Sequence, residues 1–176
     1  MRRLLVVVVL VLAAAVAYRS FGSAETGTGT LTLAQPAPNV GQKVPAFTAT
    51  GIDGEDFDLS KKGAYVLTYW STLNKSSSDA RPDFARLADE YGSRGVSFAA
   101  VYVNGAPTED ESAPYVVIQD SHGRLASLYN VKRVPRLFLI RNGRVELVQN
   151  GFYDGSTRAL RAKLDELMDE RAETSR

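Results

Sequence analysis

The segment from Tyr65 to Tyr91 constrains the fold of this chain most, because it combines a strand, a short loop and a helix. Aromatic and aliphatic residues predict a buried strand over Tyr65–Tyr69, which runs into Trp70. After a polar loop, apolar residues recur at helical spacing and share one face of a predicted helix: Phe84, Leu87, Ala88 and Tyr91. The start of such a helix offers unpaired N–H donors and partial positive charge, which lower the pKa of a nearby nucleophile. The loop is therefore the first place to look for a reactive group.

The sequence of this loop resembles the active-site motif of a known family. The residues from Trp70 onward, W-S-T-L-N-K-S-S-S-D-A-R-P, are similar without a gap to W-A-x-W-C-x-x-C-R-x-E-x-P. That motif belongs to TlpA-like thiol–disulfide oxidoreductases, in the redoxin branch of the thioredoxin superfamily. The resemblance places the two family cysteines at Asn74 and Ser77, and the acidic residue that helps to move the proton at Ala80. The motif is therefore kept in outline without its reactive groups.

The atoms of this loop exclude the redox reaction of the family. The chain contains no cysteine, and a thiolate is the species that attacks a disulfide. The degenerate loop Asn74, Lys75, Ser76 and Ser77 offers only amide, amine and hydroxyl groups. We therefore predict no catalytic residue at this position, although the resemblance is to thiol–disulfide oxidoreductases and antioxidant proteins.

The remaining apolar runs agree with a thioredoxin-like α/β fold, a three-layer α/β/α sandwich with a mixed central sheet. A turn at Ile52–Glu55 between two alternating runs predicts an N-terminal β-hairpin over Ala46–Thr50 and Asp56–Leu59. Two strands are expected next, over Val96–Val103 and Tyr115–Ile118, and a short helix follows over Ser121–Tyr129. Two more strands are expected over Leu137–Ile140 and Val145–Val148, joined by a turn at Asn142-Gly143. The last element is a helix that Ser156 caps, with these apolar residues on one face: Leu160, Leu164, Leu167 and Met168. Because only Asn104–Pro114 separate two of the strands, we predict that the second core helix of the family is shortened or lost.

Residues 1–21 predict a signal peptide or a membrane anchor. A positively charged start precedes an unbroken apolar run over Leu4–Ala17. Small residues at 13–15 suit cleavage, whereas Tyr18 and Arg19 directly after the run suit an interfacial anchor. Both alternatives place the rest of the chain in a bacterial-type cell envelope, on the extracytoplasmic side of the cytoplasmic membrane, either anchored or secreted. A buried core helix is the third alternative.

Composition divides the rest of the chain into a linker, a domain and a tail. Residues 22–40 are rich in Gly, Thr, Ala and Pro and predict a flexible linker, with an edge strand over Leu31–Leu33 as the alternative. The thioredoxin-like domain is expected over residues 41–168, and a charged, frayed tail over residues 169–176. The net charge is +1 and no basic stripe is present, so nucleic acid is not an implied partner.

A second part of the predicted site lies at Val134 and Pro135. Their context before a predicted strand is similar to that of the cis-proline of the superfamily. In the family this loop packs beside the C-x-x-C loop, and the backbone before the proline pairs with an extended peptide. The resemblance therefore implies a cis Val134–Pro135 bond and a binding groove formed by Trp70, Asn74, Ser77, Val134 and Pro135. A plain turn before a strand, and a packing role for the tryptophan, are the alternatives.

Other chemistry finds little in the sequence to support it. Ser77 would need a desolvated Lys75 as its base, and the serines at 76–78 are more typical of a helix N-cap. His122 is the only histidine, and with no cysteine present we predict no metal site and no cofactor. The acidic residues Glu109–Glu111 lack the spacing of a calcium loop and predict a solvated loop.

Three hypotheses of function fit these observations. The first is a redox-inactive, membrane-tethered module that binds an extended peptide or partner protein in the cis-proline groove. The second is a non-thiol subunit of a thiol–disulfide oxidoreductase or cytochrome-maturation system, in which a partner chain supplies the cysteines. The third is a degenerate domain without a ligand. An assay for thiol exchange separates the second from the other two.

Overall fold

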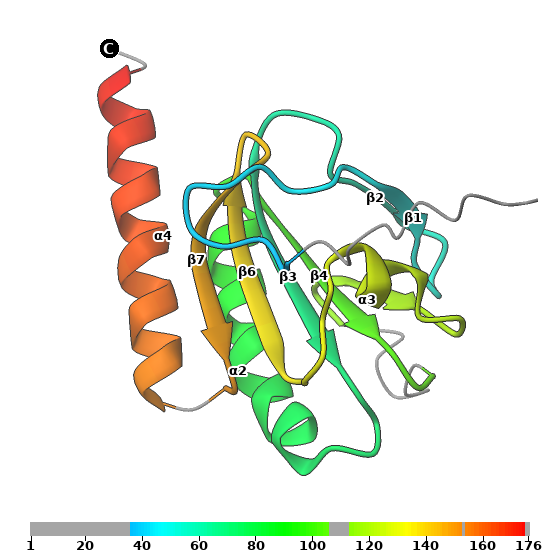
Figure 1. Ribbon diagram of the computed structural model, residues 1–176. Helices are drawn as coiled ribbons and strands as arrows, with labels where there is room; N and C mark the ends of the chain where they lie inside the picture. Colours follow the sequence, from blue (N-terminus) through cyan, green and yellow to red (C-terminus); the bar gives the residue numbers. More distant parts are fainter. Residues whose placement is uncertain (1–35, 106–112, 153, 175–176) are drawn as a thin grey trace, which may run out of the picture. The chain divides into compact units, whose positions relative to one another are not determined.

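A five-stranded mixed sheet forms the centre of the computed structural model, which describes residues 36–105, 113–152 and 154–174 (Figure 1). The strand order is β5-β4-β3-β6-β7, and a separate two-stranded hairpin pairs β1 with β2. The strands are β1 (Thr48–Thr50), β2 (Asp56–Asp58), β3 (Ala64–Trp70), β4 (Val96–Tyr102), β5 (Val116–Gln119), β6 (Arg136–Arg141) and β7 (Arg144–Asn150), and the helices are α2 (Lys75–Gly92), α3 (Arg124–Leu128) and α4 (Asp154–Thr174). The thioredoxin-like fold with its N-terminal hairpin, predicted from the sequence, is confirmed.

The central strand β3 is buried on both faces, as its continuous apolar sequence predicts. It runs parallel to β4 and antiparallel to β6. Because side chains alternate along a strand, Val66 and Trp70 face one core, and Tyr65, Leu67 and Tyr69 face the other. The sheet therefore separates two apolar layers that meet along this strand.

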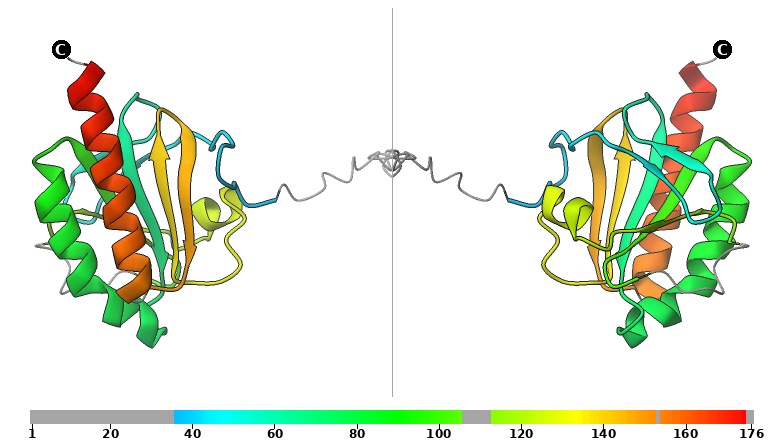
Figure 2. Two further views of the ribbon diagram at one scale, coloured as in Figure 1. Left: turned by 90° about the vertical axis from the view of Figure 1, so that its left-hand side faces the viewer. Right: turned by 90° about the vertical axis from the view of Figure 1, so that its right-hand side faces the viewer.

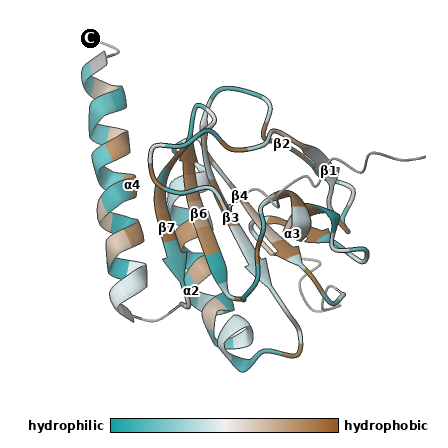
Figure 3. Ribbon diagram, in the orientation of Figure 1, coloured by the Kyte–Doolittle hydropathy of each residue, from teal (hydrophilic) through white to brown (hydrophobic). Residues whose placement is uncertain are grey.

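Helices α2 and α4 cover one face of the sheet, as the views in Figure 2 show. The predicted apolar face of α2 is confirmed, because its buried residues include Phe84, Leu87, Ala88 and Tyr91. Phe84 lies at the centre of this layer, with ring centroids 5.1 Å from Trp70 and 4.9 Å from Tyr115. The hairpin and α3 pack against the other core, and apolar residues gather on the strands between the layers (Figure 3).

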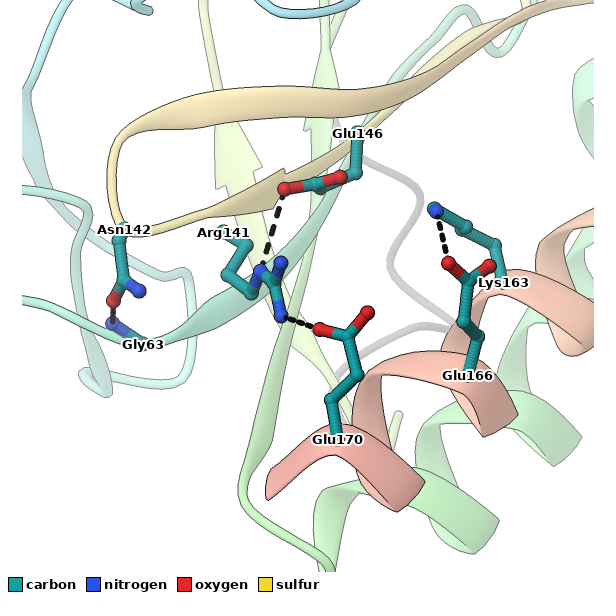
Figure 4. Close-up of polar contacts among 7 residues, drawn as sticks. All are labelled: Gly63, Arg141, Asn142, Glu146, Lys163, Glu166 and Glu170. Carbon is teal, nitrogen blue, oxygen red and sulfur yellow. Dashed lines mark hydrogen bonds and ion pairs between the residues drawn. The ribbon is translucent and has the colours of Figure 1, made fainter. Parts of the chain in front are cut away.

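The turn between β6 and β7 is the one that Asn-Gly predicts. Asn142 has φ of 50° and Gly143 has φ of 75°. Positive φ at both central residues is typical of the type I′ turn, whose twist matches that of the flanking strands. The Asn142 side chain also accepts a hydrogen bond of 3.2 Å from the Gly63 N–H and joins this turn to the start of β3 (Figure 4).

Helix α4 is longer at both ends than the sequence predicts. Its apolar face is confirmed, since Leu160, Leu164, Leu167 and Met168 are buried. The helix begins at Asp154, so Ser156 lies in its first turn and not at the cap. It continues to Thr174, so the tail expected from residue 169 is helical over most of its length. Glu170 pairs there with Arg141 of β6, a tertiary contact that a local charge pattern does not reveal (Figure 4).

Several predictions fall on residues that the structure does not describe. Residues 1–35 hold the predicted signal or anchor and most of the predicted linker, and residues 106–112 hold most of the connection whose helix is expected to be shortened or lost. The described chain joins the sheet at Gly41, whose N–H donates to the carbonyl of Val145 at 2.8 Å. Within the described ranges, no helix combines the length and the apolar character needed to cross a membrane.

We predict that Phe84→Ala destabilises the fold strongly. The side chain is fully buried between aromatic rings, so its loss leaves a cavity that costs about 3–5 kcal/mol in free energy of unfolding. Leu73→Ala is the matched control, because Leu73 is 84% exposed and its change is expected to stay within about 0.5 kcal/mol. Urea unfolding followed by tryptophan fluorescence measures both. Equal effects in the two variants would contradict this packing.

A second prediction concerns the contact between α2 and α4. The Tyr91 hydroxyl donates to the Asp165 carboxylate at 2.7 Å, and burial together with this bond raises the pKa of Tyr91 to about 12. A raised pKa in the folded state means that the contact stabilises fully below the unfolded pKa of about 10 and is lost as the pH rises through about 12. Tyr91→Phe is therefore expected to lower stability by about 1 kcal/mol at neutral pH. In urea titrations, its deficit relative to wild type should shrink above about pH 10, whereas a constant deficit would speak against the contact.

Candidate functional site

Both parts of the predicted site lie at one end of the sheet. Strand β3 ends at Trp70 and leads through Ser71–Asn74 into α2, and strand β6 begins at Arg136, opposite Tyr69 in the antiparallel register. The loop before β6 therefore reaches the same edge as the loop after β3. Sequence-distant segments meet here because β3 pairs directly with β6.

Asn74 joins the two loops. It is the N-cap of α2, and its Oδ1 accepts a hydrogen bond of 3.1 Å from the Ser77 N–H. Its Nδ2 donates to the carbonyl of Val134 at 3.4 Å. The prediction that the serines at 76–78 cap this helix is thus wrong, because the helix starts one residue before them and the asparagine satisfies the free N–H.

Ser77 is buried and acts as a structural group. Its Oγ accepts a hydrogen bond of 3.3 Å from the Ser71 N–H. The Oγ of Ser71 in turn accepts hydrogen bonds of 3.1 Å from the Leu73 N–H and from Asn104 Nδ2. These bonds hold the loop after β3 in one conformation. No sequence pattern points to Asn104, because it lies in the connection after β4 and the parallel pairing of β3 with β4 brings it here.

The geometry does not support a serine nucleophile. Lys75, the nearest candidate base in the sequence, is exposed and pairs with both carboxylate oxygens of Asp79 at 2.8 and 2.7 Å. A lysine acts as a base when it is desolvated, whereas the Lys75 side chain is exposed to solvent and ion-paired. Ser77 is therefore left without an activating partner in this loop.

The Val134–Pro135 peptide bond is cis. Val134 is partly buried, and its carbonyl is held by Asn74. Among the residues that the structure describes, none accepts a hydrogen bond from the Val134 N–H. An open backbone donor beside a held carbonyl is the arrangement that an added strand can use.

Two residues of the predicted groove offer no side-chain surface. Trp70 is fully buried, with its ring packed edge-on against Phe84, Tyr102 and Tyr115. Its Nε1 has no hydrogen-bond partner in the described part of the chain. Pro135 is buried as well. Both differ from the expected groove-lining role, because their side chains are buried and, for Trp70, because packing against Phe84, Tyr102 and Tyr115 covers the ring.

Leu73 is the exposed apolar residue that the sequence analysis missed. Its side chain is 84% exposed, although the hydrogen bond to its N–H fixes its backbone. The signal was a single apolar residue inside a polar loop, directly before the helix cap Asn74. The accessible part of the site therefore consists of Leu73, Asn74 and Val134, together with the polar loop residues around them.

The site is electropositive on the side of β6. Lys132 and Arg133 are exposed just before Val134. Arg136, just after the proline, donates to Asn150 Oδ1 at 2.6 Å and lies 5.1 Å over the ring of Phe138. Burial lowers the pKa of the Arg136 guanidinium, and its Nε has no hydrogen-bond partner within the described ranges.

The other candidates of the sequence analysis lie elsewhere. His122 is exposed and lines a pocket of about 920 Å³ between the hairpin and α3. Glu109–Glu111 fall outside the described residues. Across the described ranges, no group of three or more His, Asp or Glu side chains is placed to hold a metal ion.

Solved structures with the same fold include thiol–disulfide proteins. A protein described as the thiol:disulfide interchange protein DsbE from Chlorobium tepidum is 27% identical, with a TM-score of 0.65, and the match covers 75% of this chain and 99% of that one. StoA from Bacillus subtilis is 22% identical, with a TM-score of 0.57, and covers 68% and 96%. The exposed lipoprotein thioredoxin Etrx1 from Streptococcus pneumoniae is 21% identical, with a TM-score of 0.58, and covers 69% and 99%.

The sequence itself also shows the family to which the chain belongs. No curated protein sequence is significantly similar to the chain. The AhpC/TSA family, however, matches residues 40–148, which include both loops of the site. This match confirms the redoxin resemblance and spans more than half of the 176 residues. The chain is therefore a member of the AhpC/TSA family that has a thioredoxin-like fold and no cysteine.

Proposed function

We propose that this protein is a membrane-tethered, extracytoplasmic thioredoxin-like module that binds an extended peptide segment beside Val134 and does not exchange disulfides. The observation that carries the proposal is the contrast at one site. The Val134 N–H, which has no acceptor among the described residues, lies next to a loop in which Asn74 and Ser77 occupy the family's cysteine positions. This contrast supports peptide binding through the Val134 backbone, without the thiols that disulfide exchange requires.

The lack of redox chemistry follows from atom type and from bonding. Disulfide exchange proceeds through attack by a thiolate, and the chain has no sulfur at either position. The groups that replace the thiols are engaged in structure, since Asn74 caps α2 and Ser77 accepts the Ser71 N–H. Neither side chain is left free to react with a bound segment.

Peptide binding is supported by backbone and side-chain features together. An extended segment placed along the loop before β6 would accept the N–H of Val134 in the manner of strand addition. Leu73, across the Asn74–Val134 hydrogen bond, would supply apolar contact at the edge of the same surface. Burying its exposed side chain contributes about 1.5–3 kcal/mol of binding free energy at most.

The location outside the cytoplasm rests on the N-terminal sequence and on related proteins. Residues 1–21 combine arginines at the start with an apolar run, the pattern of an export signal or anchor. One structural relative is an exposed lipoprotein, and another is a secreted disulfide oxidoreductase from Mycobacterium tuberculosis. A tether would hold the binding surface close to the membrane without involving the sheet.

Thiol-exchange assays test the redox part of the proposal. With insulin and dithiothreitol, wild type is expected to give the rate of the protein-free blank, because it has no thiolate. The Asn74→Cys/Ser77→Cys variant is expected to exceed the blank, since both sulfurs would lie at the start of α2, where thiol pKa values fall.

The matched control for that assay is Ser76→Cys/Ser78→Cys, which adds two thiols in the same turn at exposed positions. It is expected to stay at the level of a free dithiol. Activity of the wild-type chain above the blank would overturn the redox-inactive assignment. Equal rates in the two double variants would show that the loop no longer has the frame of a redox site.

Peptide binding is tested by changing the exposed leucine. We predict that Leu73→Glu lowers the affinity of the full chain for immobilised extended peptides by about tenfold, the equivalent of about 1.4 kcal/mol. Ile52→Glu, at an apolar residue of the hairpin turn that is 38% exposed, is expected to leave affinity unchanged. Biolayer interferometry over a peptide library measures both. Failure of the wild-type chain to bind any peptide would refute the proposed function.

A further inference from the structure

The two ends of β6 differ in how their cations are compensated. At the end of β6, Arg141 lies between two glutamates, Glu146 of β7 and Glu170 of α4 (Figure 4). Both contacts raise the pKa of the Arg141 guanidinium. The Arg141 guanidinium is therefore paired within the fold, and this side chain offers little charge to a partner.

At the beginning of β6, the cations have no such counterpart. Lys132, Arg133 and Arg136 lie within five residues of one another around the cis peptide bond. No carboxylate of the described chain forms an ion pair with any of the three. Asp79, in the first turns of the helix that Asn74 caps, is already paired with Lys75. The loop before β6 thus carries a local excess of positive charge.

Arg136 is partly buried, so part of this excess positive charge has lost solvation free energy. Arg136 has a neutral partner, Asn150, and a buried Nε without a hydrogen bond in the described residues. A guanidinium partly removed from water, with no counter-charge among the described residues, recovers only part of its lost solvation from the Asn150 oxygen and the Phe138 ring. An anionic group placed at this end of the sheet would recover part of that loss, because the interaction of charges strengthens where water is excluded.

We propose that the segment bound beside Val134 is acidic, with Asp or Glu residues flanking an apolar side chain. This inference rests on the proposed function and names the chemical class of its ligand. The backbone of the segment would accept the Val134 N–H, its apolar residue would cover Leu73, and its carboxylates would lie near Lys132 and Arg133. Successive side chains of an extended peptide alternate between its faces, so one strand can present both kinds of group to the surface.

Charge-matched peptides test this class of ligand. Fluorescein-labelled extended peptides of equal length share one leucine and carry Glu, Gln or Lys at the flanking positions. In fluorescence anisotropy with the full chain in neutral detergent, the Glu peptide is expected to bind about tenfold more tightly than the Gln peptide, and the Lys peptide more weakly than both. The preference should fall as NaCl rises from about 50 mM to about 500 mM, because salt screens exposed charges.

Two double variants locate the effect. Lys132→Gln/Arg133→Gln is expected to remove the preference for Glu over Gln while the Gln peptide keeps its affinity. Lys43→Gln/Lys62→Gln removes the same charge from exposed residues near the β6–β7 turn and the start of β3, and the preference should persist. Because both variants change the net charge equally, a general electrostatic attraction would affect them alike.

The outcomes separate the inference from the proposed function. Equal affinity for the Glu and Gln peptides, with both lost in Leu73→Glu, would overturn the acidic ligand and leave peptide binding beside Val134 intact. A preference that is lost equally in the two double variants would also overturn it. If none of the three peptides binds and the library yields no other ligand, the proposed function fails with it.

Discussion

Burial of β3 on both faces is the constraint on which the site depends. Its side chains belong alternately to the core under α2 and α4 and to the core under the hairpin and α3. Its two neighbours, β4 and β6, fix it laterally through parallel and antiparallel ladders. The end of this strand therefore cannot move without disturbing the packing of both cores. The loop after β3 and the loop before β6 are held in place for the same reason.

At the two positions where the family motif has cysteines, this chain has side chains that form hydrogen bonds. A cysteine sulfur is a weak hydrogen-bond partner, whereas Asn74 and Ser77 form bonds that link the start of α2 to both neighbouring loops. Each such bond contributes about 0.5–1.5 kcal/mol. These hydrogen bonds thus stabilise the loop after β3 in one conformation.

Patterns that repeat within one element were enough to predict most of the fold. The strand at Tyr65–Tyr69, the apolar face of α2 and the Asn-Gly turn follow from local spacing, and the structure has them at those places. Features that depend on distant partners were not predictable in this way. The extension of α4 includes the contact between Glu170 and Arg141, and the burial of Trp70 depends on rings from three other elements or loops. The motif predicted where the site residues lie in the sequence, but the tertiary packing of the rings determines which of them are exposed.

Exposure and charge, more than residue identity, distinguish what each part of the site can do. Trp70 matches the first tryptophan of the family motif and contributes packing, while Leu73 stands at the second tryptophan position of the motif and contributes surface. In the same way, Arg136 and Arg141 stand at the two ends of one strand, and among the described residues carboxylates pair with Arg141 and not with Arg136. Under the proposed function, the unpaired Arg136 lies at the end of β6 where the Val134 N–H also has no acceptor in the described part of the chain. Recognition by charge and recognition by strand pairing would then act on the same segment, which is the condition under which weak contacts combine into a specific one.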